Sequence, residues 1–511
     1  MPRTRIAAID VGTNSIHMIV VEAQRHGYRV IDKEKDMVQL GRGSLEGRPL
    51  TEDAIERGVD ALKRMAGIAE RWQVTEVVAV ATSAIREAPN GRRFINAAQK
   101  AAGIRIRVIT GEEEADYIYR AVRSAIDFHG GTALTVDIGG GSVELIVGTS
   151  DEVYLTASEP VGALRMAQMF ALEGRATPAM VEDCRRHVRK RLKKTLGRIA
   201  ALGFDFTVGT SGTIVTLATL AAAVNANSDT TTSGLRWLSR KRLRELVDAL
   251  TPLPAADRAR RFSIDERRAS TLLAGAIVLD EVMRKLELDQ IRACDTALRE
   301  GIVEAVLDRK LVSPERKDSV RRSSVLGLVE RSDIERTHAA HVARLALRIF
   351  DQTQDLHQFR TGERELLEYA ALLHEVGMHV SYQGHQKHSY YLISHAGLRG
   401  FTGDQVAVVA NVARYYRKAA PSDEHENFAQ LSDAQKGQVR KLAAILRMAD
   451  ALDRGRRRAV RDVRVQASQG NVRFQVRLRG EGEVELAAAH KRSRYFGKVF
   501  ETHVDIESSA A

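Results

Sequence analysis

One short pattern occurs twice in this chain, and it limits the possible folds more than any other feature. Residues 7–22 read AAIDVGTNSIHMIVVE and residues 134–149 read LTVDIGGGSVELIVGT, so that an aspartate, a glycine and a serine recur at matching positions. Each copy combines two β-branched runs with a glycine-containing turn, which predicts two strands joined by a tight turn. Two copies therefore predict two similar half-domains that face each other.

The turn in each copy has the residue types of an anion-binding loop. Glycines let backbone N–H groups approach a phosphate closely, and an aspartate at a strand end can hold Mg²⁺ directly or through water. One such loop is common in ordinary hairpins, but two predict a clamp on a phosphate chain. A third turn, within VGTSGTIVTLATL at 208–220, begins a predicted helix, where either an anion or an ordinary helix cap fits the pattern. The candidate phosphate-binding residues are Asp10, Gly12, Thr13, Asn14, Ser15, Gly139, Gly140, Gly141, Ser142, Ser211, Gly212 and Thr213.

The order of strand and helix patterns predicts several domains. Strands and helices alternate in the first three hundred residues, which predicts an α/β architecture with a first lobe at 1–130 and a second at 131–308. Proline, serines and dense charge predict a linker at 309–325. Apolar residues spaced three and four apart then predict a helical domain at 326–458. The segments DVRVQA, NVRFQVRLRG and EVELAA have strand periodicity and predict a small α/β cap at 459–511.

Composition bounds the class of protein. A chain of 511 residues with 44% apolar and 28% charged residues is typical of a globular protein with several cores. No stretch reaches the roughly 18 apolar residues of a membrane span, and the N-terminal residues enter a predicted strand without a signal region. Cys184 and Cys294 form neither a disulfide framework nor a zinc pattern. We therefore expect no membrane span and a location in the reducing cytoplasm.

The charge balance favours polyanionic partners without choosing among them. Lysine and arginine number 78 against 66 aspartates and glutamates, a net charge of +12. An arginine-rich solvated surface explains the same excess, and we expect the basic helix EDCRRHVRKRLKKTL to be such a surface. Aromatic residues are only 5%, and no interleaved aromatic platform is present, so we expect no nucleic-acid partner.

Five stretches resemble one known family. AIDVGTNSIHMIV, VAVATSAIREAPN, VITGEEEADYIYRAV, VDIGGGSVEL and LREGIV are similar, in this order, to motifs of the exopolyphosphatase/guanosine pentaphosphate phosphohydrolase (Ppx/GppA) family, within the actin–Hsp70–sugar kinase superfamily. The resemblance covers residues 1–305. It implies two duplicated ribonuclease H-like (actin-like) lobes, cleavage of phosphoanhydride bonds with Mg²⁺, and a homodimer.

The resemblance also implies roles for individual residues. Asp137 and Glu144 would bind the metal from the two strands of one hairpin. The family's catalytic glutamate stands before a small residue, which selects Glu114 as the general base, with Glu113 as the alternative. Arg86 corresponds to the family's arginine beside the phosphate and would contribute to catalysis.

The resemblance leaves the substrate open. We expect release of terminal orthophosphate from inorganic polyphosphate, and the alternative is removal of the 5′ γ-phosphate from guanosine pentaphosphate. A more distant alternative is an ATP-dependent kinase or chaperone of the same superfamily, but only LLAGAIVLDEV near residue 275 resembles a second nucleotide loop.

The helical region resembles the HD metal-dependent phosphohydrolases. His341, the pair His374-Glu375 and Asp450 occur in the order of that superfamily's ligands, with glutamate in place of its second aspartate. Either these residues form a second divalent-metal site, or the fold is retained and the histidines only pack, hydrogen-bond or contact the phosphate chain. If a metal binds at these residues, hydrolysis at the helical domain instead of between the two lobes is a further alternative.

Overall fold

The computed structural model of this chain describes residues 4–223, 236–310, 320–468 and 470–510. The chain divides into two compact units, whose boundary in the sequence lies between residues 317 and 318. Among the described residues, no helix combines the length and the apolar character that crossing a membrane requires.

The linker predicted at 309–325 lies only partly within the described residues. Residues 311–319 lie outside the described residues. Residues 309–310 end helix α11 (Leu298–Lys310) and residues 320–325 begin helix α12 (Val320–Arg331), so the linker prediction was wrong for these two stretches. The dense charge there misled the prediction because one of its arginines is a buried structural residue. Arg321 is 5% exposed, donates to the carbonyl oxygen of Gly400 and forms an ion pair with Glu365.

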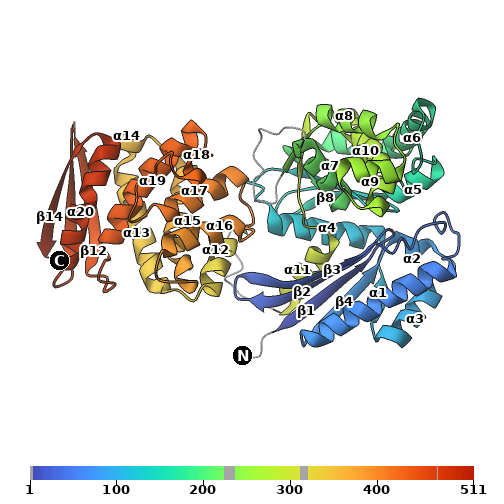
Figure 1. Ribbon diagram of the computed structural model, residues 1–511, viewed down its shortest axis with the longest axis horizontal. Helices are drawn as coiled ribbons and strands as arrows, with labels where there is room; N and C mark the ends of the chain where they lie inside the picture. Colours follow the sequence, from blue (N-terminus) through green and yellow to red (C-terminus); the bar gives the residue numbers. More distant parts are fainter. Residues whose placement is uncertain (1–3, 224–235, 311–319, 469, 511) are drawn as a thin grey trace. The chain divides into compact units, whose positions relative to one another are not determined.

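The first lobe contains a five-stranded sheet with the order β3-β2-β1-β4-β5 (Figure 1). Strand β1 is antiparallel to β2 and parallel to β4. The strands are β1 (Arg5–Val11), β2 (Ile16–Gln24), β3 (Gly27–Asp36), β4 (Glu76–Ala81) and β5 (Ile106–Val108). The helices are α1 (Glu52–Arg71), α2 (Ser83–Glu87), α3 (Gly91–Ala102) and α4 (Gly111–Ala125).

Alternation along β1 decides where its aspartate lies. Successive side chains of a strand point to opposite faces. Ala7 and Ile9 pack with helices α1 and α3 in one core cluster, whereas Ile6 and Ala8 pack with α4 in another. Asp10 belongs to the second series, so its carboxylate lies on the face of the sheet that α4 covers.

The second lobe repeats the topology of the first. Its sheet has the order β10-β11-β9-β6-β7-β8, and β8-β7-β6-β9-β11 reproduces β3-β2-β1-β4-β5 with the same strand directions. The predicted duplication is therefore confirmed. The strands are β6 (Ala133–Ile138), β7 (Val143–Gly148), β8 (Val153–Glu159), β9 (Phe206–Thr210), β10 (Arg236–Ser239) and β11 (Gln290–Ala293).

The outer face of the second sheet is covered by helices. Leu134, Val136 and Ile138 share a core cluster with residues of α6, α7, α8 and α10, whereas Ala133 packs on the opposite face with α4. Asp137 alternates with Val136 and therefore lies on the same face as Ala133. The helices are α5 (Ala163–Met169), α6 (Pro178–Leu202), α7 (Ser211–Ala223), α8 (Arg240–Leu250), α9 (Ala255–Phe262) and α10 (Glu266–Lys285).

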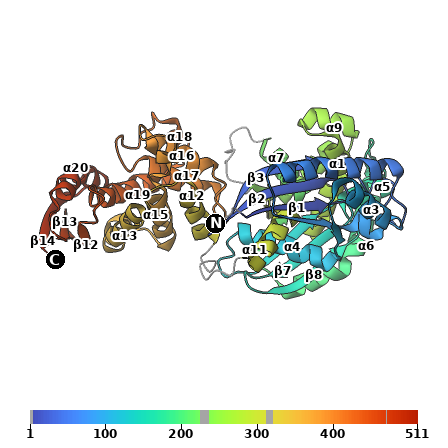
Figure 2. The ribbon, with the colours of Figure 1, turned by 90° about the horizontal axis from the view of Figure 1, so that it is seen from below.

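Helices α4 and α11 (Leu298–Lys310) lie between the two sheets (Figures 1 and 2). Although α11 follows the second sheet in sequence, it packs on α4 and β1 of the first lobe. Gly301 permits this close approach, because a Cβ at that position would lie 1.7 Å from the carbonyl oxygen of Tyr117. Both aspartates of the duplicated motif thus face the helices that join the lobes.

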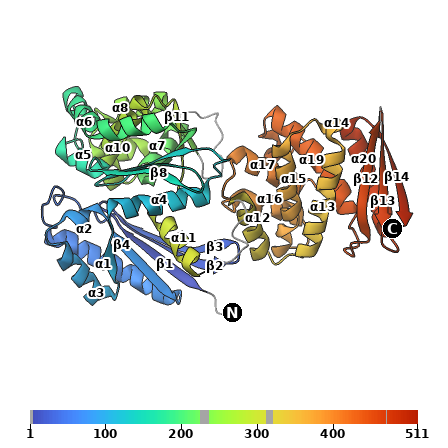
Figure 3. The same cartoon turned by 180° about the vertical axis from the view of Figure 1, so that it is seen from behind.

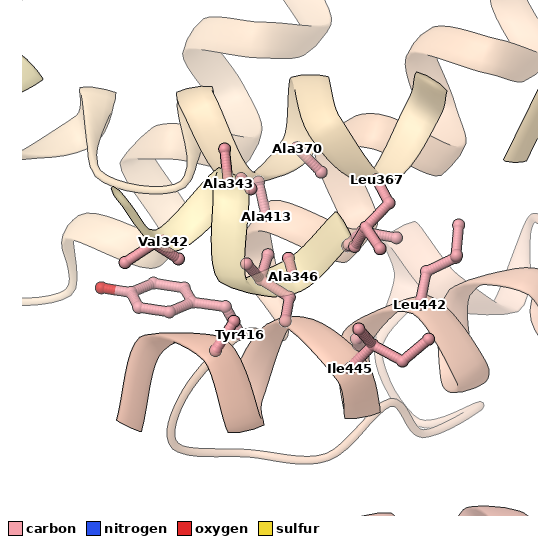
Figure 4. Close-up of a cluster of buried hydrophobic side chains, with 14 of the residues drawn as sticks. Val342, Ala343, Ala346, Leu367, Ala370, Ala413, Tyr416, Leu442 and Ile445 are labelled. Carbon is pink, nitrogen blue, oxygen red and sulfur yellow. The ribbon is translucent and has the colours of Figure 1, made fainter. Parts of the chain in front are cut away.

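The C-terminal unit combines a helical bundle with a small sheet (Figure 3). Apolar residues of the bundle, such as Val342, Leu367 and Ile445, form its core (Figure 4). The helices after α12 are α13 (Arg336–Gln352), α14 (Gln354–His357), α15 (Thr361–Leu373), the 3₁₀ helix η2 (Val376–His379), α16 (His385–His395), α17 (Gly403–Arg414), α18 (Glu426–Ala429) and α19 (Asp433–Ala451).

The C-terminal sheet has the order β12-β13-β14, and its Phe474 belongs to the same core cluster as the bundle. The elements are β12 (Val460–Ser468), β13 (Asn471–Leu478), α20 (Glu483–Phe500) and β14 (His503–Ala510). The strand predicted for EVELAA was wrong, because this segment is the first turn and a half of α20. Its short alternation is followed by alanines, lysines and arginines, which favour a helix.

Candidate active site

The two duplicated turns have the same hydrogen bond. The amide of Gly12 donates to the carbonyl oxygen of Ser15 over 3.1 Å, and the amide of Gly139 donates to that of Ser142 over 3.0 Å. The turns also touch each other, since a Cβ on Gly140 would lie 3.2 Å from the amide nitrogen of Asn14. Glycine at this position therefore lets the two loops close on one space.

That space is a cavity of about 320 Å³, called the phosphate cleft below. It is lined by side chains or backbone of both duplicated turns, of the start of α7, and of helices α4, α10 and α11. Every candidate phosphate-binding residue lines it: Asp10, Gly12, Thr13, Asn14, Ser15, Gly139, Gly140, Gly141, Ser142, Ser211, Gly212 and Thr213.

The third turn adds an irregular backbone at the wall of the cleft. Ser211 has φ of 86°, the left-handed region that non-glycine residues rarely adopt. Ser211, Gly212 and Thr213 are the first residues of α7, and the first amide N–H groups of a helix point out of its N-terminal end, where anions are favoured. Thr13 Oγ1 and Ser83 Oγ lie 2.8 Å apart next to Gly141, and both residues line the cleft, so hydroxyl groups complete the wall at the duplicated turns.

Asp137 and Glu144 are directly opposite each other in the register of β6 and β7. Two carboxylates at such a cross-strand position repel each other unless a cation lies between them. Both are buried, at 6% and 1% exposed. Glu144 Oε1 accepts from the hydroxyl of Ser158, whereas its Oε2 has no hydrogen-bond partner among the described residues.

Burial makes these carboxyl groups weaker acids than usual. Burial raises the pKa of Asp137 well above its usual value, and the charges of Glu144 and Asp10 raise it further. The pKa of Asp10 is raised to about 7, chiefly by burial, although Arg299 opposes the shift. Oδ1 of Asp10 also lacks a hydrogen-bond partner within the described part of the chain. A hard divalent cation such as Mg²⁺ fits this set of unpaired carboxylate oxygens.

Glu114 lies in the first turn of α4, which a capping box between Thr110 and Glu113 stabilises. It is 8% exposed and lines the cleft. Burial raises the pKa of Glu114 well above its usual value, Glu144 adds to the shift, and Arg86 lowers it. Glu113 instead caps the helix and pairs with Arg107 outside the cleft.

Arg86 supports the glutamate from behind. Its Nη1 donates to the carbonyl oxygen of Ile109 over 2.8 Å and to Glu114 Oε2 over 3.4 Å. Neither Arg86 nor Glu144 is among the residues that line the cleft. In this structure Arg86 therefore contacts the candidate base and no cleft-lining phosphate loop.

Sequence reasoning missed the basic wall of the cleft. We give this name to Lys35, Arg268, Arg299 and His17, which all line the cavity. His17 and Lys35 are opposite each other on the neighbouring strands β2 and β3, whereas Arg268 and Arg299 come from the distant helices α10 and α11. The three cations Lys35, Arg268 and Arg299 repel one another, since burial, Arg268 and Arg299 lower the pKa of Lys35 to about 8. Burial and the same three cations lower the pKa of His17 well below its usual value, so this imidazole is neutral. Only Arg299, within the motif LREGIV, and His17, within the first copy of the duplicated motif, carried a sequence signal.

The C-terminal unit contains a separate group of metal-ligand types. His338, His374, Glu375 and Asp450 offer one ligand atom each, and all four atoms lie within 4.8 Å of one another. Three of these residues were predicted. The structure groups them with His338 and not with the predicted His341, which lies one helical turn further along α13 and lines another cavity.

Two duplicated α/β lobes that enclose glycine loops and buried carboxylates define a protein of the actin-like fold. Residues 19–310 match the Ppx/GppA phosphatase family, and residues 320–485 match domain III of Ppx/GppA phosphatases. The chain therefore belongs to the Ppx/GppA phosphatase family, whose members are phosphoanhydride hydrolases.

Curated relatives and solved structures agree with this membership. The guanosine-5′-triphosphate,3′-diphosphate pyrophosphatase of Vibrio vulnificus is 30% identical over 417 residues, which cover 81% of each chain. An exopolyphosphatase from Cytophaga hutchinsonii is 27% identical, with a TM-score of 0.57, over 60% of this chain and 98% of that one. The Ppx/GppA family member of Aquifex aeolicus is 28% identical, with a TM-score of 0.51, over 61% of this chain and all of the other.

Proposed function

We propose that this protein is a Mg²⁺-dependent exopolyphosphatase, which hydrolyses the terminal phosphoanhydride bond of inorganic polyphosphate. The observation that carries the proposal is the phosphate cleft itself. Two glycine loops approach from opposite lobes, and a buried glutamate and the basic wall line the same cavity. A terminal phosphate between the loops and further phosphates along the cations fit this arrangement.

The chemistry requires a positioned water and a held phosphate. Backbone amides of the loops at Gly12 and Gly140 would bind the terminal phosphate oxygens, and Glu114 would accept a proton from the attacking water. The water oxygen forms a bond to the terminal phosphorus while the bridging P–O bond breaks. The products are orthophosphate and a chain shorter by one phosphate, which keeps the bridging oxygen.

The metal would be held by the cross-strand pair. Asp137 and Glu144 would bind Mg²⁺, which neutralises phosphate oxygens when it is present. Their buried and partly unpartnered oxygens support this assignment. The side chains of the basic wall would neutralise the remaining phosphates of the substrate.

Removal of the 5′ γ-phosphate from guanosine pentaphosphate is the second candidate. It is favoured by the curated relatives, which are named guanosine-5′-triphosphate,3′-diphosphate pyrophosphatases. Both substrates present a terminal phosphate on a phosphoanhydride, so the cleft chemistry is the same for the two. The two substrates differ in what is attached beyond the first phosphates: further phosphates in polyphosphate, and a nucleoside in guanosine pentaphosphate.

Phosphate release from the purified full-length chain decides between the two. We expect kcat/KM for a long polyphosphate to exceed that for guanosine pentaphosphate at equal Mg²⁺. A higher value for the nucleotide would reverse the assignment. Glu114→Gln serves as the matched inactive control, so that phosphate released by a contaminant is recognised. Light scattering on the same sample tests the expected homodimer.

A further inference from the structure

The C-terminal unit brings four buried side chains to one point from three helical segments. His338 lies in the first turn of α13. His374 and Glu375 directly follow α15, and Asp450 lies near the end of α19. Their exposed fractions are 2%, 0%, 3% and 5%. Buried carboxylates and imidazoles in this number are rare unless they are paired or bind a metal.

The hydrogen bonds of the two imidazoles leave one nitrogen of each ring free to bind a cation. His338 Nδ1 lies 2.8 Å from Asp453 Oδ2, and His374 Nδ1 lies 2.6 Å from the carbonyl oxygen of Ala371. Both acceptors require a proton on Nδ1, so Nε2 carries the lone pair in the neutral ring. Such partners typically orient histidine ligands of metal ions.

Both free nitrogens point at the carboxylates without bonding to them. His338 Nε2 and His374 Nε2 are buried and have no hydrogen-bond partner among the described residues. His338 Nε2 lies 3.8 Å from Glu375 Oε2, and His374 Nε2 lies 3.8 Å from Asp450 Oδ1. These separations are too long for hydrogen bonds. They are close to the edge of about 3.4 Å in a tetrahedron whose ligands lie about 2.1 Å from a central ion.

The remaining carboxylate oxygen of Glu375 has its own partner. Arg456 Nη2 lies 2.5 Å from Glu375 Oε1, so this ion pair turns Oε2 toward His338. A hydrogen-bonded outer contact of this kind is common for metal-binding carboxylates. His338, His374 and Glu375 therefore each have one atom held by a hydrogen bond and another directed at the shared point. Asp450 is buried beside them.

We propose that His338 Nε2, His374 Nε2, Glu375 and Asp450 bind one divalent first-row transition metal ion that holds α13, α15 and α19 together. Two imidazole nitrogens with two carboxylates favour Mn²⁺, Fe²⁺, Co²⁺ or Zn²⁺ over Mg²⁺. Four protein ligands in a closed environment are typical of a structural site, because a catalytic site keeps a position open. The ion therefore stabilises this unit and takes no part in hydrolysis at the phosphate cleft.

Cobalt titration of the chelator-treated full-length chain tests this site. Co²⁺ in a site of low coordination number with nitrogen ligands absorbs in the visible range, whereas Asp137 and Glu144, the proposed metal ligands of the N-terminal unit, offer oxygen atoms only. We expect one equivalent to develop this absorption in the wild type and in Glu144→Gln. His341→Ala, one turn along the same helix but outside the group, is the matched control and keeps the signal.

His338→Ala and His374→Ala should lose the absorption and the metal-dependent rise in melting temperature of this unit. Asp453→Asn should weaken Co²⁺ binding by about 10- to 100-fold, the usual effect of a residue that orients a ligand. If a variant fails to fold, Asp450→Asn replaces it, with circular dichroism as the check. Wild-type spectra and stoichiometry in His338→Ala would overturn the proposal, as would a wild type without the absorption.

Phosphate release provides an independent readout. His338→Ala should keep kcat on polyphosphate within about threefold of the wild type at a temperature where both are folded. Loss of hydrolysis together with loss of Co²⁺ would instead make this site catalytic and contradict the structural role. Because the cobalt signal does not depend on turnover, the site stands or falls separately from the proposed function.

Discussion

Arg86 Nη1 lies 3.4 Å from Glu114 Oε2, so the two residues expected to be catalytic contact each other. Only the glutamate lines the phosphate cleft. The arginine is held by the carbonyl oxygen of Ile109, which keeps its guanidinium behind the carboxylate. Arg86 therefore positions Glu114 and favours its charged form. For this reason, we expect different effects from substituting Glu114 and from substituting Arg86.

Glu114→Gln should lower kcat on polyphosphate by about 10² to 10⁴, the usual range for loss of a general base. The amide has the same shape and cannot accept a proton from water, so phosphate-chain binding should persist. Stopped assays of phosphate release give kcat, and the melting temperature gives folding. Glu113→Gln is the matched control because that residue caps α4 outside the cleft. A loss below threefold in Glu114→Gln would reject it as the base.

Arg86→Ala should move the acidic limb of the pH profile to higher pH. Burial and Glu144 raise the pKa of Glu114, and Arg86 lowers it, so removing the arginine raises this pKa further. The base works in its ionised form, and activity therefore rises with pH through that pKa. The profile of kcat/KM with Mg²⁺ measures the limb. An unchanged limb with a higher KM would assign Arg86 to phosphate contact instead.

Glu144→Gln and Asp137→Asn should raise the Mg²⁺ concentration needed for half-maximal activity by at least about tenfold, since even residues that only orient ligands cost this much. The two carboxylates are opposite each other across β6 and β7, so each variant leaves the other in place. Magnesium titrations of activity measure the shift. Asp205→Asn is a control at an exposed end of the same sheet, where it accepts from the amide of Thr132. Equal half-saturation in all variants would remove the pair from the metal site.

The duplicated turn was predictable because its information is local. Glycine spacing defines the turn, and strand alternation then directs Asp10 and Asp137 to the inner faces of their sheets. The register of β6 and β7 even sets Glu144 opposite Asp137, as their separation in sequence indicates. Fold and phosphate loops therefore followed from short segments.

The basic wall and the histidine group were less predictable because they depend on tertiary packing. Lys35 and Arg268 lie outside the five segments that resemble the family, and only tertiary packing brings them to the cleft. His338 and His341 are both buried on α13, and their spacing of one turn lets either face the same side. The crossing of α13 with α19 selects His338, which the sequence pattern alone does not reveal.

Asp10→Asn should stabilise the metal-free N-terminal unit at pH 8 and have little effect at pH 4. The folded-state pKa of Asp10 is raised to about 7 from 3.8, so its ionisation disfavours folding. The penalty is absent below the unfolded pKa, grows as the pH rises, and is complete above about pH 7. A shift of this size corresponds to about 4 kcal/mol. Urea unfolding with a chelator at both pH values measures it, and equal stability of the two proteins at pH 8 would contradict the raised pKa.

Arg268→Ala and Lys35→Ala should raise KM for long polyphosphate by about 10- to 100-fold, the effect of losing one charged hydrogen bond, with a smaller change in kcat. Both cations line the same cleft as the loops that would hold the terminal phosphate, and on this proposal they contact later phosphates of the substrate. Their loss should also flatten the rise of KM with ionic strength, because fewer attractive charges remain to be screened.

The control for this prediction lies on the basic helix α6. Lys193 is exposed there, on a surface with no contact to the cleft, so Lys193→Ala should leave KM and its salt dependence unchanged. If Lys193→Ala raised KM as much as Arg268→Ala, general charge attraction would explain binding, and the basic wall would lose its assignment as the path of the chain. If instead only the wall variants respond, and more strongly for long chains than for short ones, local contacts with successive phosphates account for substrate affinity.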